Sequence, residues 1–205
     1  IPRRGRIFSG LVRIPVSRIG VGVANLVLWP TGTPDSVRTP LFVSFGENLP
    51  VTTFDEMLQY LRFFASASRL QALRDAGDAR RAEAWSRFLA DTDPNPQTAV
   101  HEGLRDYFGR VRVANERFRE EGGAGWMSDR GMVFVSLGDP DQIYEQGTND
   151  VSQRGRAQIW EYRQYSAQLV FIDQSGFGRW RLTTSSEADF RSILNRVQSQ
   201  GAAAP

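Results

Sequence analysis

The stretch that most constrains this chain is residues 122–141, GGAGWMSDRGMVFVSLGDPD. Before it, back to about residue 53, apolar residues recur at helical spacing, whereas after it, to about residue 184, short β-prone runs alternate with turns. Within it, glycines flank Trp126, and we expect Ser128 and Asp129 to cap backbone amides in the turn into a strand over 132–137. The stretch therefore predicts a hinge within one α+β fold, in which a helical bundle packs on a small, mostly antiparallel β-sheet.

Composition limits the chemistry that such a fold can carry. All 25 basic residues are arginine, and the 23 acidic residues leave a net charge of +2, so the concentrated basic face of a nucleic-acid-binding protein is not expected. The absence of cysteine excludes disulfides, thiolate metal sites and thiol nucleophiles. His101 is the single histidine, and neither a G-x-S-x-G elbow nor a phosphate-binding glycine motif occurs. We therefore expect no metal and no organic cofactor.

Residues 1–46 are predicted to form a β-rich N-terminal extension, or the remnant of a preceding β-domain. The β-prone runs at 7–16, 21–29 and 41–45 are too few to bury both faces of a sheet, and an extended segment of this kind gains most by pairing with another protein. Arginines near the start would add affinity for an acidic, membrane-proximal surface. The candidate partner-binding residues are Arg3, Arg4, Arg6, Leu11, Val12, Arg13, Arg18 and Trp29.

Helices are predicted over residues 53–121. Thr53 and Glu56 form a capping box, and apolar residues follow it at helical spacing up to Phe64. Three further helices are predicted at 67–75, 78–90 and 98–121, with a break at Gly77 and a turn at two closely spaced prolines, 94 and 96. Asn115 falls on the apolar seam of the last of these helices, where we interpret it as a buried polar group that sets the register.

A sheet is predicted over residues 132–184, followed by a C-terminal helix at 187–198 and a frayed tail at 201–205. A hairpin turn at 173–178 and a polar surface loop at 146–156 connect the strands. With their own caps, turns and apolar stripes, residues 47–200 are expected to close a core by themselves. The predicted strands are 132–137, 142–145, 158–162, 168–173 and 179–184.

The run Gly125-Trp126-Met127-Ser128-Asp129-Arg130-Gly131 resembles the motif that names the GWxTD family of bacterial envelope-associated domains. Residues 137–143 are similar to the family's G-x-P-D-x-I turn, residues 158–162 to its aromatic strand, and the order and spacing agree over about residues 41–185. Ser128 stands where the family usually has threonine, which keeps the hydroxyl. The residues of the family's structural motif are Gly125, Trp126, Ser128, Asp129, Arg130, Gly138, Pro140, Asp141, Trp160 and Tyr162.

The resemblance implies an architecture and a location rather than a reaction, because the family has no established activity. Longer members are often exported, sometimes as lipoproteins, and carry a β-domain before this module. A periplasmic or peripheral membrane location is therefore expected. The chain starts at Ile1 rather than Met, which leaves room for a signal peptide or a lipid anchor upstream.

We expect a non-enzymatic, membrane-extrinsic structural or accessory subunit. Its partners would be other protein subunits of a bacterial membrane complex, such as a respiratory or photosynthetic assembly, with no nucleic acid and no identified small-molecule substrate. Two alternatives stay open: a hydrolase-like enzyme whose carboxylates meet only in the fold, and an outer-membrane assembly or secretion lipoprotein. Asp139, Asp141 and Glu145 lack the spacing of an EF-hand and are interpreted as turn formers. A deep pocket with convergent carboxylates would favour the enzyme. Uncovered apolar surface on residues 1–46 would favour the structural subunit.

Overall fold

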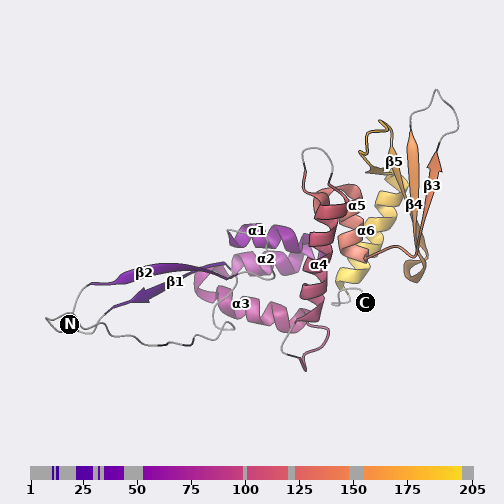
Figure 1. The fold of residues 1–205 in the computed structure, drawn as a ribbon. Helices are drawn as coiled ribbons and strands as arrows, with labels where there is room; N and C mark the ends of the chain where they lie inside the picture. Colours follow the sequence, from indigo (N-terminus) through magenta and orange to yellow (C-terminus); the bar gives the residue numbers. More distant parts are fainter. Residues whose placement is uncertain are drawn as a thin grey trace.

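The computed structural model describes residues 11, 13, 22–29, 32, 35–43, 53–98, 101–119, 123–147 and 155–199. These residues form six α-helices and two antiparallel sheets (Figure 1), which confirms the predicted α+β class. Of the strand predicted at 7–16, only Leu11 and Arg13 are described, and neither lies in a strand. The predicted tail at 201–205 lies outside the described residues. None of the described helices is both long and apolar enough to cross a bilayer.

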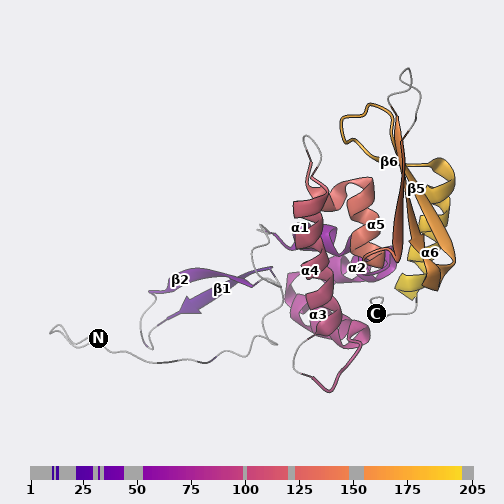
Figure 2. The ribbon, with the colours of Figure 1, turned by 45° about the vertical axis from the view of Figure 1, so that its right-hand side comes forward.

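A two-stranded hairpin forms most of the described part of the N-terminal extension. Its strands are β1 (Gly22–Leu28) and β2 (Val37–Val43), which pair antiparallel with Leu28 opposite Val37 at the tip. In Figures 1 and 2 the hairpin projects from the helical bundle, with its tip directed away from the bundle. No third strand joins it within the described residues, and a two-stranded hairpin is at best marginally stable in isolation.

The helical half follows the predicted pattern, with adjusted ends. The capping box forms, because the Glu56 amide donates to Thr53 Oγ1 (3.2 Å) and the Thr53 amide donates to Glu56 Oε2 (3.1 Å). Gly77, at a φ of +63° that favours glycine, separates the second and third helices, and the fourth helix is shorter than predicted. The elements are α1 (Phe54–Tyr60), η2 (Leu61–Phe63), α2 (Ala67–Asp75), α3 (Gly77–Thr92) and α4 (Glu102–Arg117).

The strand predicted over 132–137 is wrong, because these residues belong to a helix, α5 (Asp129–Leu137). Ser128 Oγ caps it by accepting the Gly131 amide at 3.1 Å, and the helix ends at Gly138, which has a φ of +82°. Six of its nine residues are buried, since it lies between α4 and the sheet (Figure 2). A helix covered on most sides is apolar on most sides, which is why its sequence resembles a buried strand. The sheet therefore begins at residue 142 rather than 132.

The sheet itself is four-stranded and antiparallel, in the order β3-β4-β5-β6. The four strands predicted after residue 141 are all present with shifted ends, although the last is only two residues long. A final helix packs along β5 and continues to the bundle, where Gln198 Nε2 donates to the backbone oxygen of Arg62 at 3.1 Å. The elements are β3 (Gln142–Gly147), β4 (Arg156–Tyr162), β5 (Ala167–Asp173), β6 (Arg181–Leu182) and α6 (Thr184–Ser199).

One aromatic core joins the two halves. The ring of Phe118, at the end of α4, lies 5.4 Å from Phe134 on α5 and 5.6 Å from Trp160 on β4. Trp160 in turn lies 4.8 Å from Phe171 on β5. Trp160 and Phe171 are at most 1% exposed, and burying an aromatic side chain of this size contributes roughly 2–3 kcal/mol. The sheet is therefore fixed to the bundle through a continuous apolar contact.

A half-buried histidine caps the start of α4. His101 Nδ1 accepts the Leu104 amide at 3.1 Å, and its Nε2 lies 3.0 Å from Thr92 Oγ1. The Thr92 hydroxyl donates to the backbone oxygen of Phe88, so it accepts from His101, and this network selects the neutral ring with its proton on Nε2. Burial lowers the pKa of His101, although the nearby Asp93 opposes the shift.

We expect the free energy of unfolding to fall as the pH is lowered from 7.5 to 5.5. The folded state holds His101 neutral with a lowered pKa, whereas the unfolded chain protonates at the ordinary value near 6.5, so its contribution is present above that pH and is lost below it. The variant His101→Asn keeps an N-capping side chain and should lose much of this dependence. Urea denaturation at several pH values measures both proteins. An equally steep dependence in the variant would contradict the assignment.

Candidate functional site

The motif residues predicted from the sequence gather where a short 3-10 turn, η3 (Gly125–Met127), joins α4 to α5. Three backbone segments meet here through two glycines. A Cβ atom on Gly125 would lie 2.2 Å from the Ala114 oxygen on α4, and one on Gly131 would lie 1.9 Å from the Gly125 oxygen. Neither distance is sterically allowed, so the crossing of α4, η3 and α5 requires glycine at both positions.

Trp126 is a packing anchor at this crossing. Its ring is 4% exposed, stacks on Tyr60 with centroids 4.7 Å apart and meets Phe63 edge-on at 6.0 Å. The guanidinium of Arg62 lies 4.8 Å from the ring centroid, a cation–π distance. The backbone amide of Trp126 donates to Asn115 Oδ1 at 3.2 Å. Asn115 is half-buried and ties α4 to the motif, a more local task than setting a register.

Ser128 and Asp129 both bind backbone groups. The Ser128 hydroxyl accepts the Gly131 amide and donates to the Gly125 oxygen at 2.8 Å, which closes the turn into α5. Asp129 reaches across to the sheet, where its Oδ2 accepts the Leu182 amide at 2.7 Å and its Oδ1 lies 3.4 Å from Arg181 Nη1. The predicted amide capping therefore occurs, but Asp129 caps an amide of β6, which is distant in the sequence.

The remaining motif residues fix the turn between α5 and β3. The Tyr162 hydroxyl donates to the Gly138 oxygen at 3.0 Å, and burial raises the pKa of this tyrosine. Asp141 accepts the Arg163 amide at 2.7 Å and its own amide donates to the Glu161 oxygen. Pro140, between them, limits the backbone of the turn. Trp160, on the same strand as Tyr162, belongs to the aromatic core described above.

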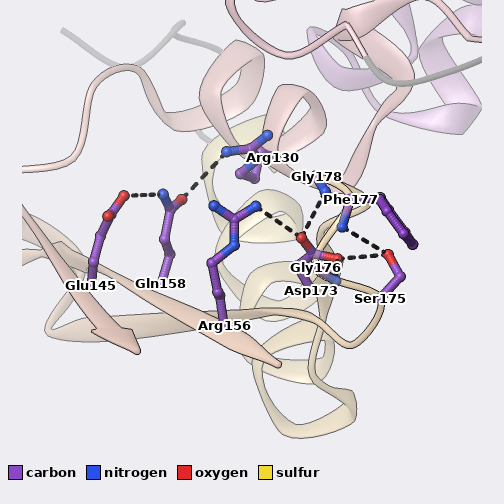
Figure 3. A network of polar contacts seen from close by, with 9 residues as sticks. All are labelled: Arg130, Glu145, Arg156, Gln158, Asp173, Ser175, Gly176, Phe177 and Gly178. Carbon is purple, nitrogen blue, oxygen red and sulfur yellow. Dashed lines mark hydrogen bonds and ion pairs between the residues drawn. The ribbon is translucent and has the colours of Figure 1, made fainter. Parts of the chain in front are cut away.

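A polar network extends the inner face of the sheet beyond the aromatic core (Figure 3). Asp173, at the end of β5, is 0% exposed. Its carboxylate accepts the amides of Gly176 (3.0 Å) and Gly178 (2.7 Å) and the Ser175 hydroxyl (2.9 Å), and it pairs with Arg156 at 3.0 Å. Burial alone would raise the pKa of Asp173, but these donors outweigh it and lower the pKa to about 2. The group is therefore a permanent acceptor that shapes the loop.

Two arginines face one indole ring beside this carboxylate. The guanidinium carbons of Arg130 and Arg156 lie 4.9 Å and 5.2 Å from the ring centroid of Trp180. Arg130 also donates to Gln158 Oε1 at 3.5 Å, and Gln158 Nε2 donates to Glu145 at 2.5 Å. Figure 3 shows this chain of contacts running from Glu145 to Arg130. Arg130, which also belongs to the motif, thus fixes the start of α5 over the polar end of the sheet.

The aspartates of this region are engaged by other groups of the same chain. Asp129, Asp141 and Asp173 each accept a backbone amide, and Asp139 pairs with Arg117 at 2.8 Å. Over the described ranges, no three His, Cys, Asp or Glu residues lie close enough to hold a metal ion.

Two of the hollows in the described part of the chain do not gather buried carboxylates. One of about 610 Å³ lies beside β6 and is lined by Arg179, Arg181 and hydroxyl side chains. The other, of about 380 Å³, lies between α2 and α3, where the lining carboxylates Asp75, Glu83 and Asp91 are all exposed.

Three of the eight candidate partner-binding residues are described by the structure. Arg3, Arg4, Arg6, Val12 and Arg18 fall outside the described residues. Leu11 is 83% exposed and Trp29, at the hairpin tip, is 69% exposed, and Arg13 is exposed as well. Among the described candidates, Trp29 on the projecting hairpin lies apart from the motif (Figures 1 and 2).

Sequence reasoning missed the partners of the motif. Arg181 and Leu182 on β6 meet Asp129 only because the chain folds back after more than fifty residues, and no local pattern indicates such a contact. Asp173 carried a usable signal, because an aspartate followed by Ser175, Gly176 and Gly178 is the composition of a loop in which the carboxylate accepts backbone amides. We predicted a hairpin turn there and did not assign its carboxylate.

The comparisons with known proteins identify one relationship. A family model described as the GWxTD domain matches residues 35–175. Searches of curated proteins and of solved structures find no match.

Replacing Gly131 by alanine should lower the free energy of unfolding by about 3 kcal/mol or more, because the added methyl group overlaps the Gly125 oxygen and the crossing must open. Gly109→Ala is the matched control, since Gly109 also lies within a helix but a Cβ there meets nothing within 4 Å. It should be neutral or stabilise by about 0.5–1 kcal/mol. Urea denaturation compares the two. Equal stabilities would contradict the close approach.

Proposed function

Because the chain belongs to the GWxTD domain family, we propose that it is a non-enzymatic, membrane-extrinsic structural or accessory subunit. Its partners are other protein subunits of a membrane complex in the bacterial envelope. The observation that carries the proposal is the apolar tip of the projecting hairpin β1–β2. The tip is defined here as Leu28, Trp29 and Val37.

The tip exposes three large apolar side chains to water, which is unfavourable unless another surface covers them. Leu28, Trp29 and Val37 are 56%, 69% and 64% exposed, and Leu28 and Val37 form a cross-strand pair. Exposed apolar groups are ordinary one at a time, but a contiguous group on a projecting element is typical of a contact surface. Tryptophan is among the residue types most enriched in binding hot spots.

Exposed arginines in the N-terminal extension suit a protein partner near an acidic surface. Arg13 and Arg38 are exposed, and Arg38 lies in β2 next to Val37. Arginine is enriched in protein interfaces because its planar guanidinium pairs with carboxylates and stacks on aromatic rings. Together with the arginines of the first eighteen residues, these charges support a periplasmic location close to a membrane.

The motif region supports the same proposal because its polar groups are engaged within the fold. Ser128, Asp129 and Asp141 direct their side-chain oxygens to backbone amides of the same chain, and Trp126 is buried among rings. Polar groups used in this way hold a fold together. The motif residues of the family therefore stabilise the fold, and we place the binding surface on another part of the chain.

The test is whether the full-length chain is retained in a native complex through the hairpin tip. Membranes of the source organism expressing a tagged chain are solubilised gently, and the fraction of chain that co-sediments with large complexes is measured. We expect Trp29→Ser to reduce this fraction at least about tenfold, as for a hot-spot residue. Phe177→Ser is the matched control, because Phe177 is also an exposed aromatic side chain, at 85%, far from the tip. It should leave the fraction unchanged.

Three results would count against the proposal. The first is sedimentation of the wild-type chain only as a free monomer. The second is full occupancy of the Trp29→Ser variant, and the third is an equal loss of occupancy in both variants. Deleting residues 1–46 offers an independent arm, because it should remove the chain from the complex while circular dichroism still reports a folded domain. Unfolding of the truncated chain would contradict the division between an N-terminal arm and a self-contained fold.

A further inference from the structure

The four-stranded sheet has two edges, and the chain treats them differently. At the β6 edge the Thr183 amide donates to the Val170 oxygen of β5, so the neighbouring Leu182 amide points away from the sheet. Asp129 accepts that amide at 2.7 Å. The first helix turn of α5 thus occupies the position where another strand would pair, and the β6 edge is closed.

The β3 edge has no such cover within the described residues. β3 pairs with β4 alone, and its six residues keep a continuous register with β4, Gln142 opposite Glu161 through Gly147 opposite Arg156. In Figure 1 it forms the outer border of the sheet. Alternate amides and carbonyls of such a strand point outward, over a length of roughly 20 Å at 3.3 Å per residue.

β3 lacks several of the features that protect an edge, although Glu145 supplies one charge. Its sequence, QIYEQG, contains neither proline nor lysine, and its register shows no bulge. Ile143 and Tyr144 remain 44% and 45% exposed in the middle of the strand. A regular, partly apolar edge of this kind is a template for another strand.

The side chains on β3 define what that strand must carry. Ile143 and Glu145 lie on one face, opposite Trp160 and Gln158 of β4, and Tyr144 lies on the other face, opposite Ile159. Glu145 is exposed and is held by Gln158 at 2.5 Å. An incoming strand therefore meets an apolar group and a carboxylate two positions apart on one face, and an aromatic ring on the other.

A second copy of this chain fits that pattern poorly. Two β3 strands paired antiparallel about Tyr144 would place the carboxylate of each Glu145 against the Ile143 side chain of the other copy. That arrangement desolvates two carboxylates beside apolar groups without a cation, and this is costly. A basic side chain at the same position pairs with Glu145 instead.

We propose that the β3 edge is a docking site for an extended segment of a partner protein, which adds a fifth strand to the sheet. The segment carries an apolar residue opposite Ile143 and an arginine or lysine opposite Glu145. This site is separate from the hairpin tip and goes beyond the proposed subunit role.

The experiment uses a defined probe, a fluorescent peptide of sequence TRVIVRT, in which an isoleucine lies two positions from an arginine in either direction. Fluorescence anisotropy measures its binding to the full chain. The same peptide N-methylated at the isoleucine and both valines is the first control, because it keeps the side chains and loses backbone donors. We expect it to bind at least about tenfold more weakly, since main-chain hydrogen bonds supply much of the affinity in strand addition. Equal binding of the two peptides would overturn the proposal.

Hydrogen exchange on the wild-type chain reports the geometry directly. Saturation with the peptide should slow exchange of outward amides within residues 142–147 and leave β6 unchanged. Binding without any protection in β3 would also overturn the proposal. Protection of β3 that appears with rising protein concentration, in the absence of peptide, would identify a second copy as the occupant and so refute a partner segment.

Variants complete the test. Ile143→Lys should weaken peptide binding at least about tenfold, as a charge placed on an edge does, and Glu145→Gln by about threefold, as for an exposed charge pair. Met127→Lys is the matched control, because Met127 is 51% exposed and lies away from the sheet edge, and it should bind like wild type. Trp29→Ser should also bind like wild type, so failure of the hairpin proposal and failure of this one are distinguishable. Loss of binding in Met127→Lys or Trp29→Ser would contradict a site confined to β3.

Discussion

The close approach of α4, η3 and α5 at Gly125 and Gly131 is the contact on which the rest of the fold depends. It brings the backbone of α5 within van der Waals distance of the turn that precedes it, which no residue with a Cβ atom permits. Trp126 then fills the space between this crossing and Tyr60 and Phe63 of the helical half. Geometry at one point thus sets the angle at which α5 leaves the bundle, and with it the position of every group that α5 presents to the sheet.

Asp129 shows what that angle achieves. Because α5 starts at the glycine crossing, its first carboxylate reaches the outward amide of Leu182 on β6. An acidic residue in the first turn of a helix also interacts favourably with the helix dipole, so one side chain stabilises the helix start and closes a sheet edge. The hydrogen bond is partly buried and charge-assisted, a class worth roughly 1.5–3 kcal/mol. The two-residue strand β6 is therefore held from both sides, by β5 and by α5.

The main error of sequence reasoning has a physical cause. The run Met-Val-Phe-Val-Ser-Leu at 132–137 is β-branched, apolar and bounded by glycines, and a short run of this kind fits a buried strand as well as a buried helix. The decisive signals lay at its ends. Ser128 accepts the Gly131 amide three residues on, as an N-cap does, and Gly138 adopts a positive φ, as a residue after a helix often does. We had assigned the capping role correctly to Ser128 and Asp129 and attached it to the wrong element.

Local patterns predicted the capping box, the break at Gly77, the turn prolines and most strands, because these depend on neighbours in sequence. The contacts between Asp129 and β6, between Asn115 and Trp126, and around Trp180 join distant segments, and composition and periodicity carry no information about them. In the fold, Asp129, Asp141 and Asp173 accept amides, and Arg130 and Arg156 lie over an indole ring.

The polar groups of the motif bind within the fold, so groups available to a partner lie at the edges of the structure. Two such margins stand out among the described residues, the hairpin tip with three exposed apolar side chains and the β3 edge with its outward amides. They use different forces, since the first offers apolar area and the second offers directional hydrogen bonds. Apolar area alone discriminates weakly between partners, whereas strand addition fixes register and direction. Under the two proposals, the hairpin tip would supply affinity and the β3 edge would fix the orientation of a partner segment.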